Sequence, residues 1–121
     1  MTNYTELAGR YIDAWNETDP ITRAALVKDL FSANARYTDP MAAAEGPEAI
    51  TDTIGAVQNQ FPGFRFRLAG DVDGHHDQVR FTWELGPGSE PAPIVGFDVA
   101  VLDPDSKIRT VLGFLDRVPQ A

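Results

Sequence analysis

The hydrophobic pattern of the chain changes its period after Phe61, and this change limits the folds that the chain can adopt. Before this point, apolar residues recur at helical spacing, which is typical of amphipathic helices. After it, apolar and polar residues alternate, as they do in strands that bury one face. Because helices come first and an antiparallel meander follows, the sequence predicts an α+β domain.

The segments with helical spacing are residues 3–17, 20–31 and 47–61. Asp19 and Pro20 favour the start of the second helix, since aspartate is a common N-cap and proline a common first helical residue. Alternation predicts strands over residues 35–40, 64–68, 79–85, 94–102 and 108–116. Asp73 and Gly74 are expected to form a hairpin turn. Residues 86–93 read as a loop and residues 103–107 as a further turn.

Three helices laid on one strongly curved, mainly antiparallel sheet would form a cone that encloses an apolar pocket. The chain has 121 residues, which is the size of one domain with a substantial core. It shows no repeat, linker or low-complexity segment. A single domain over residues 1–121 is therefore predicted.

The composition argues against several classes of function. The formal net charge of −8 disfavours nucleic acid or an anionic membrane as the partner, because phosphates are bound by basic surfaces. The chain has no cysteine, which excludes disulfides and thiolate metal sites. The N-terminal segment lacks the pattern of a signal peptide, and no stretch approaches the roughly 20 apolar residues of a membrane helix. A soluble, cytoplasmic protein is expected.

One acid interrupts an otherwise apolar strand, VGFDVAVLD at residues 95–103. Successive strand residues point to opposite faces, so Asp98 shares a face with Ala100 and Leu102. An ionised carboxylate without a partner is costly there, so Asp98 must be paired, hydrated or protonated. The opposite face carries Val95, Phe97, Val99 and Val101. If Asp98 faces the pocket, this apolar face lies outside and would be covered by a second subunit, which predicts a homodimer.

Two further polar residues lie where apolar ones are expected: Tyr11 on the buried stripe of the first helix, and Asp39 at the end of the first strand. Each also has a purely structural interpretation. A buried tyrosine usually bonds a backbone carbonyl, and an aspartate in a TDP segment often only bonds the amides of a turn. A buried aspartate such as Asp98 often pairs with an arginine. The arginines available are Arg36, Arg80 and Arg109.

The segments RYIDAWN, ARYTDP followed by EGPEAI, and GFDVAVLDPDSKIRTVLGF resemble those of the ketosteroid-isomerase and SnoaL-like branch of the NTF2-like superfamily. The resemblance covers nearly the whole chain, in order. In bacterial ketosteroid isomerases the aspartate of the first-strand DP is the general base, which implies this role for Asp39. Tyr11 matches an oxyanion-hole tyrosine. Asp98 matches a protonated aspartic acid that supplies the second donor.

This resemblance implies proton transfer or cyclisation on a small apolar carbonyl compound, without cofactor or metal. Moving a proton between the α- and γ-carbons of an enone requires a base that returns the proton, and the enolate oxygen requires donors in a dry pocket. The residues expected to bind the substrate are Trp15, Phe66, Phe81, Trp83, Val111 and Leu115. At Phe31 and Ile54 the chain lacks the supporting tyrosines of the isomerases, so a thinner donor network is expected.

Two other functions remain open on the same sequence. The pocket could hold an apolar ligand without catalysis, or the domain could be structural and bind a partner protein. An enzyme is distinguished by Asp39 and Asp98 converging on one cavity. Epoxide hydrolysis would need an Asp–Arg–Asp set, and Arg80 alternates away from the pocket face. His75 and His76 are expected in a solvated turn and not in a metal site.

Overall fold

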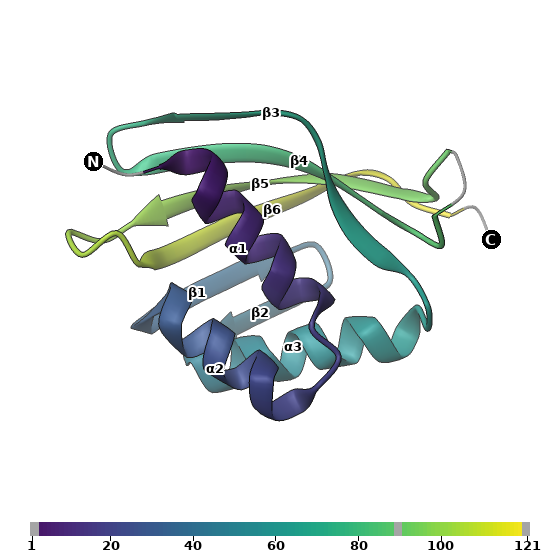
Figure 1. Ribbon diagram of the computed structural model, residues 1–121, viewed down its shortest axis with the longest axis horizontal. Helices are drawn as coiled ribbons and strands as arrows, with labels where there is room; N and C mark the ends of the chain where they lie inside the picture. Colours follow the sequence, from purple (N-terminus) through teal and green to yellow (C-terminus); the bar gives the residue numbers. More distant parts are fainter. Residues whose placement is uncertain (1–2, 89–90, 120–121) are drawn as a thin grey trace.

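The computed structural model describes residues 3–88 and 91–119, which form helices packed on one curved sheet (Figure 1). The helices are α1 (Tyr4–Asn16), α2 (Pro20–Leu30) and α3 (Gly46–Gln60). The strands are β1 (Phe31–Asp39), β2 (Ala42–Glu45), β3 (Arg65–His75), β4 (Gln78–Gly86), β5 (Ile94–Leu102) and β6 (Ile108–Arg117). The strand order is β2-β1-β6-β5-β4-β3. All neighbours are antiparallel except β1 and β6, which run parallel, so the sheet is mixed.

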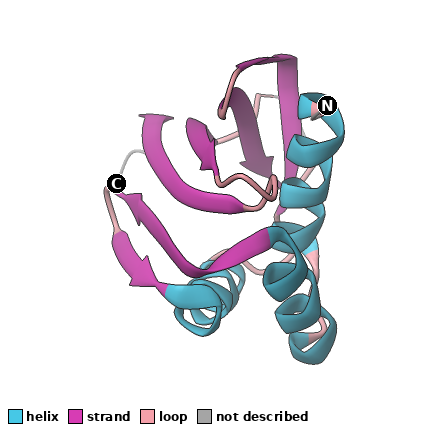
Figure 2. Ribbon diagram, turned by 90° about the vertical axis from the view of Figure 1, so that its left-hand side faces the viewer, coloured by secondary structure: helices cyan, strands magenta, loops and turns pink. Residues whose placement is uncertain are grey.

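The sheet curves strongly, and the helices close the side that it leaves open (Figure 2). α1 packs against β3, whereas α3 packs against β1 and β2, and α2 contacts both other helices. Buried apolar side chains of the helices meet those of the sheet in one core. The predicted α+β cone is confirmed.

Side-chain caps begin the first two helices. Asn3 Oδ1 accepts the backbone N–H of Glu6 at 3.0 Å at the start of α1. Asp19 Oδ2 accepts the backbone N–H of Thr22 at 2.9 Å, and Pro20 follows as the first residue of α2, as the sequence predicted. Within residues 3–88 and 91–119, no helix is long and apolar enough to cross a membrane.

The first two strands differ from the sequence prediction. β1 begins at Phe31, directly after α2, and not at residue 35. Its pairing with β6 shifts register between Phe31 and Arg36, and this irregularity breaks the alternation that reveals a strand in the sequence. β2 was not expected, since its sequence, Ala42–Glu45, favours no strand by propensity. Pairing with β1 across the turn at Pro40 makes it one.

The turn between β3 and β4 lies at His76 and Asp77, and the predicted turn at Asp73 and Gly74 is wrong. Gly74 stays in β3 because the ring of Tyr4 packs on it. A Cβ at Gly74 would lie 2.4 Å from Tyr4 Cγ. The Tyr4 hydroxyl also donates to the His76 carbonyl at 2.8 Å. The glycine therefore permits a close helix–strand contact and does not form a turn.

Candidate active site

A cavity of about 360 Å³ lies between α1, α3 and the inner face of the sheet. This volume is in the range of small-molecule binding sites. Its lining includes all three acid–base candidates, Tyr11, Asp39 and Asp98. Four of the residues expected to bind substrate also line it: Trp15, Phe66, Trp83 and Leu115. The fold thus brings side chains from α1, β1, β3, β4, β5 and β6 to one mostly apolar space.

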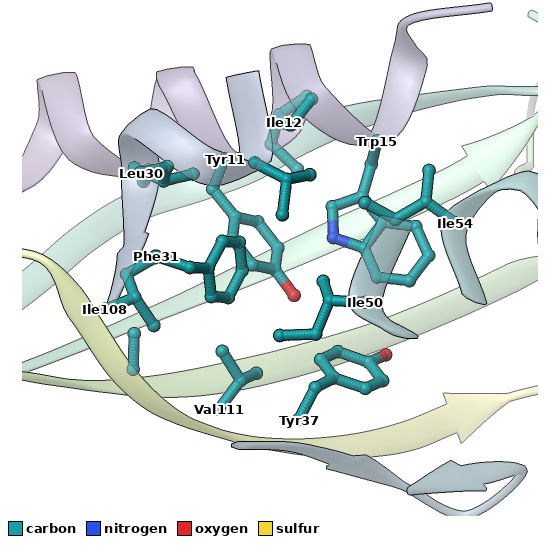
Figure 3. Close-up of a cluster of buried hydrophobic side chains, with 14 of the residues drawn as sticks. Tyr11, Ile12, Trp15, Leu30, Phe31, Tyr37, Ile50, Ile54, Ile108 and Val111 are labelled. Carbon is teal, nitrogen blue, oxygen red and sulfur yellow. The ribbon is translucent and has the colours of Figure 1, made fainter. Parts of the chain in front are cut away.

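Phe81 and Val111 were expected in the lining and are not among the residues that line the cavity. Phe81 packs edge-on against the ring of Tyr11, with ring centroids 5.1 Å apart. Val111 is fully buried on β6 beside the same cluster (Figure 3). Alternation identified their face correctly, but the curvature of the sheet places them in the core behind the cavity.

Tyr11 and Asp98 form a buried hydrogen-bonded pair. The Tyr11 hydroxyl donates to Asp98 Oδ2 at 2.6 Å, and Asp98 is only 3 % exposed. The hydroxyl of Tyr11 therefore bonds a carboxyl group and not a backbone carbonyl. Arg36 and Arg80 pair with other acids, Glu45 at 2.7 Å and Asp73 at 3.6 Å.

The protonation of Asp98 is set mainly by its burial, which raises the pKa of this carboxyl to about 6. Hydrogen bonds from Tyr11 and Trp83 lower the pKa, and the charge of Asp39 raises it again. Burial, followed by the charge of Asp98, holds the pKa of Tyr11 well above its ordinary value. Asp98 therefore keeps its proton to a higher pH than an ordinary aspartate. The neutral carboxylic acid expected from the resemblance is its main form only below about pH 6.

Asp39 has both a turn contact and a place in the cavity. Its Oδ1 accepts the backbone N–H groups of Met41 and Ala42, each at 2.8 Å. Its Oδ2 accepts the hydroxyl of Tyr37. Three hydrogen-bond donors therefore meet this carboxyl group. Because a carboxylate has about four lone-pair sites, one remains for a proton of the ligand.

Tyr37 is a site residue that the sequence analysis missed. It lies two positions before Asp39 on β1, so strand alternation places both side chains on one face, and this signal could have revealed it. Burial, then the charges of Asp98 and Asp39, raise the pKa of Tyr37 far above its ordinary value, so it stays a neutral donor. Phe31 packs on Tyr11 and offers no hydroxyl, as expected. Tyr37 nevertheless makes the donor network richer than predicted.

Gly113 allows the two acids to share the cavity. It pairs with Asp98 across β5 and β6, and it lies beside β1. A Cβ at this position would lie 2.8 Å from Asp98 Oδ1 and 3.2 Å from Asp39 Cβ. Any larger residue would therefore displace one of the acids.

We expect Gly113→Ala to lower the free energy of unfolding by about 1–3 kcal/mol, the usual cost of overpacking. Displacement of the Asp98 carboxylate should also weaken its hydrogen bond from the Tyr11 hydroxyl, so the pKa of Asp98 should change. Chemical denaturation and carboxyl titration by NMR measure the two effects. Gly9→Ala is the matched control, since a Cβ there meets nothing within 4 Å. A Gly113→Ala variant that matches the wild type in both measurements would contradict this packing argument.

Metal ligands do not gather in the part of the chain that the structure describes, where no cluster of three or more His, Cys, Asp and Glu side chains could hold an ion. His75 ends β3, and His76 lies in the following turn, where both are exposed. Their ring centroids are 6.0 Å apart. The polar side chains that line the cavity carry hydroxyl, indole, carboxyl and amide groups among mostly apolar neighbours.

Comparison with known proteins gives one family. Residues 8–111 match the model of the SnoaL-like domain family. A crystal structure described as a candidate isomerase of the SnoaL-like family, from Agrobacterium tumefaciens, is 41 % identical. The similarity covers 96 % of this chain and 99 % of that one, with a TM-score of 0.90. No curated protein matches the chain.

More distant structures share the fold. A SnoaL-like protein of unknown function from Burkholderia thailandensis is 15 % identical, with a TM-score of 0.74 over 95 % of this chain and 98 % of that one. A candidate polyketide cyclase from Sinorhizobium meliloti is 14 % identical, with a TM-score of 0.70 over 92 % of this chain and 94 % of that one. At such identities the likeness concerns the fold alone.

Proposed function

The chain belongs to the SnoaL-like domain family, and from that premise and its cavity we propose that it is a cofactor-independent acid–base enzyme. Its substrate would be a small apolar carbonyl compound. The reaction would be proton transfer between carbons, as in an isomerase, or cyclisation at the carbon activated by that transfer. The name of the relative from Agrobacterium tumefaciens supports the isomerase form.

In the isomerase form, Asp39 removes the proton from the α-carbon of a β,γ-enone. The electron pair of the broken C–H bond moves toward the carbonyl and gives an enolate. The Tyr11 hydroxyl, turned from Asp98 toward the substrate, and Asp98 in its protonated form then donate hydrogen bonds to the enolate oxygen. Asp39, whose proton can exchange with solvent while the enolate is bound, then protonates the γ-carbon, so the double bond becomes conjugated and the carboxylate is restored.

The observation that carries this proposal is the contrast between two acids in one apolar cavity. Asp98 is buried beside Tyr11, and its raised pKa keeps a proton within reach near neutral pH. Asp39 is half-buried and accepts hydrogen bonds from three donors at the edge of the cavity. Paired carboxyl groups with opposite environments are the usual arrangement of an acid and a base in one site.

The test uses a simple β,γ-enone, 3-cyclohexen-1-one, with conjugation followed by ultraviolet absorbance. Wild-type protein should accelerate conjugation, and in deuterium oxide the α-position should exchange faster than in buffer alone. If a saturating enone binds and the protein accelerates neither conjugation nor exchange, the proposal is contradicted.

A non-catalytic binder is the second candidate, and one observation favours it. Asp39 Oδ1 accepts the backbone N–H groups of Met41 and Ala42, which is the ordinary structural role of an aspartate in a turn. A binder would take up an apolar phenol such as 2-naphthol without accelerating conjugation or exchange of the enone. The two assays together separate the candidates.

We also propose that a second copy of the chain covers the outer face of the sheet, as a homodimer. Phe97 and Phe114 stack there with ring centroids 5.1 Å apart, and Phe114 is 53 % and Leu112 44 % exposed. Phe97→Asp should shift the protein toward the monomer, because each new charge would face an apolar symmetry mate. Sedimentation at micromolar concentration measures this, with Ile21→Asp on exposed α2 as control. A monomeric wild type would refute the dimer.

A further inference from the structure

The indole N–H of Trp15 is a buried donor without a hydrogen-bond acceptor among the described residues. Trp15 is 5 % exposed, and its side chain lines the cavity. Buried donors in native proteins are nearly always bonded, because an unpaired one loses its hydration and gains nothing in return. An acceptor that enters the cavity beside Trp15 would satisfy this donor.

The orientation of the Trp15 ring is held by its neighbours. Tyr37 lies on one side with ring centroids 5.5 Å apart, and the edge contact with Phe66 is at 5.3 Å. The backbone carbonyl of Trp15 accepts Gln58 Nε2 at 2.9 Å, which ties this turn of α1 to α3. Turning the ring to find another acceptor would disturb these contacts. The N–H direction is thus preorganised.

Trp15 and Tyr11 present their polar atoms together. They are four positions apart on α1, so both side chains leave the same face of the helix, with ring centroids 6.1 Å apart. Figure 3 shows the indole nitrogen on the edge of the ring that faces Tyr11. The N–H is near enough to lower the Tyr11 pKa as the smallest of several effects, yet it does not meet hydrogen-bond geometry with the hydroxyl.

We propose that Trp15 Nε1 donates a hydrogen bond to an oxygen of the bound ligand, beside the hydroxyl of Tyr11. The ligand class that fits is a flat apolar compound with one carbonyl or phenolic oxygen. This oxygen would point toward α1 and Asp98, and the rings would lie among the aromatic side chains of the cavity. The inference rests on the proposed function only in placing the ligand in the same cavity.

The first test is a ¹H–¹⁵N spectrum of the wild-type protein with two probes of equal shape. 2-Naphthol carries a hydroxyl oxygen, and 2-methylnaphthalene carries a methyl group in its place. The chain has two tryptophans, so two indole N–H signals are expected, and Trp83→Phe assigns them. 2-Naphthol should move the Trp15 indole proton downfield, whereas 2-methylnaphthalene should produce only the smaller shift of ring stacking. Equal shifts with the two probes would overturn the proposal. It would also be overturned if saturating 2-naphthol caused no shift, because the indole N–H would then stay hydrogen-bonded to a bound water or to Tyr11.

The second test measures the affinity of the same probes for Trp15→Phe, which keeps an aromatic ring and removes the donor. The preference for 2-naphthol over 2-methylnaphthalene should fall about tenfold, the effect of one hydrogen bond. Phe66→Leu is the matched control: it trims the same aromatic group without a polar atom, so it should weaken both probes alike. If Trp15→Phe also weakens both alike, Trp15 acts only by packing, and the proposal fails.

These readouts do not depend on turnover. If the wild type binds 2-naphthol through Trp15 and yet shows no enone chemistry, the proposed enzyme function fails and the Trp15 contact stands. If enone chemistry is found and the Trp15 signal is indifferent to the hydroxyl of the probe, the contact fails and the function stands. The spectrum also remains decisive if Trp15→Phe does not fold.

Discussion

Asp39→Asn should lower the turnover of the β,γ-enone by about a thousandfold, the usual contribution of a general base. The amide of asparagine has no charge and cannot take the α-proton. The turn should survive, because the amide oxygen can still accept the N–H groups of Met41 and Ala42. Binding of 2-naphthol should therefore change little, so the loss should appear in kcat and not in the affinity.

The control for Asp39→Asn is Tyr37→Phe, which removes one donor from the carboxylate and leaves the base in place. The carboxylate that would take the α-proton is unchanged in this variant, so turnover should persist. If Asp39→Asn keeps more than about a tenth of the wild-type turnover, Asp39 is not the base. Asp98 would then be the acid to examine, since its raised pKa also suits a base near neutral pH.

Asp98→Asn should raise the free energy of unfolding by up to about 3 kcal/mol at pH values above about 6. Burial raises the Asp98 pKa from 3.8 in its ordinary state to about 6 in the folded protein. The folded protein therefore favours the protonated form, and that stabilisation is complete below pH 3.8. It is lost as the pH rises through about 6, where the buried group must ionise. Asparagine never ionises, so the variant escapes this loss.

Urea denaturation at several pH values measures the effect. The two proteins should have similar stability below pH 3.8, and the variant should be the more stable one above about pH 6. Asp29→Asn, at an exposed carboxylate on α2 that pairs with Arg10, is the control and should show no such trend. A variant less stable than the wild type at about pH 7 would show that the charge of Asp98 is held by favourable partners.

The same variant separates the roles of the two acids in turnover. In the proposed mechanism, protonated Asp98 donates to the enolate oxygen, so activity should fall as the pH rises through about 6. Asparagine keeps an N–H donor at every pH, although a weaker one. Its activity should therefore be modestly lower at low pH and should lose the decline near pH 6. A decline that persists in Asp98→Asn must come from another group.

The sequence by itself determined the elements with a regular pattern and a local signal. Periodicity located the helices, and Asp19 with Pro20 marked the start of α2, because a cap and a first helical residue act within one turn of chain. Alternation along β5 was enough to place Asp98 and Phe97 on opposite faces of the sheet, since strand side chains have a period of two. These features depend only on neighbours in the chain.

The tertiary structure alone decided the features that depend on distant partners. Gly74 has a turn-forming sequence, but contact with Tyr4 keeps it in β3. β2 is a strand because β1 offers it hydrogen bonds and not because its alanines prefer one. Gly113 matters only because Asp39 and Asp98 approach it from neighbouring strands.

The same division applies to the site. The identity of Asp39, Tyr11 and Asp98 as candidates could be read from residue types in unexpected places, whereas the depth of Phe81 and Val111 depended on how the sheet curves. Local sequence patterns do not determine that curvature, because it results from strand pairing and packing over all six strands. The protonation of Asp98 is likewise a tertiary property: a strand sequence names the acid, but its pKa is set by the solvent that the helices exclude.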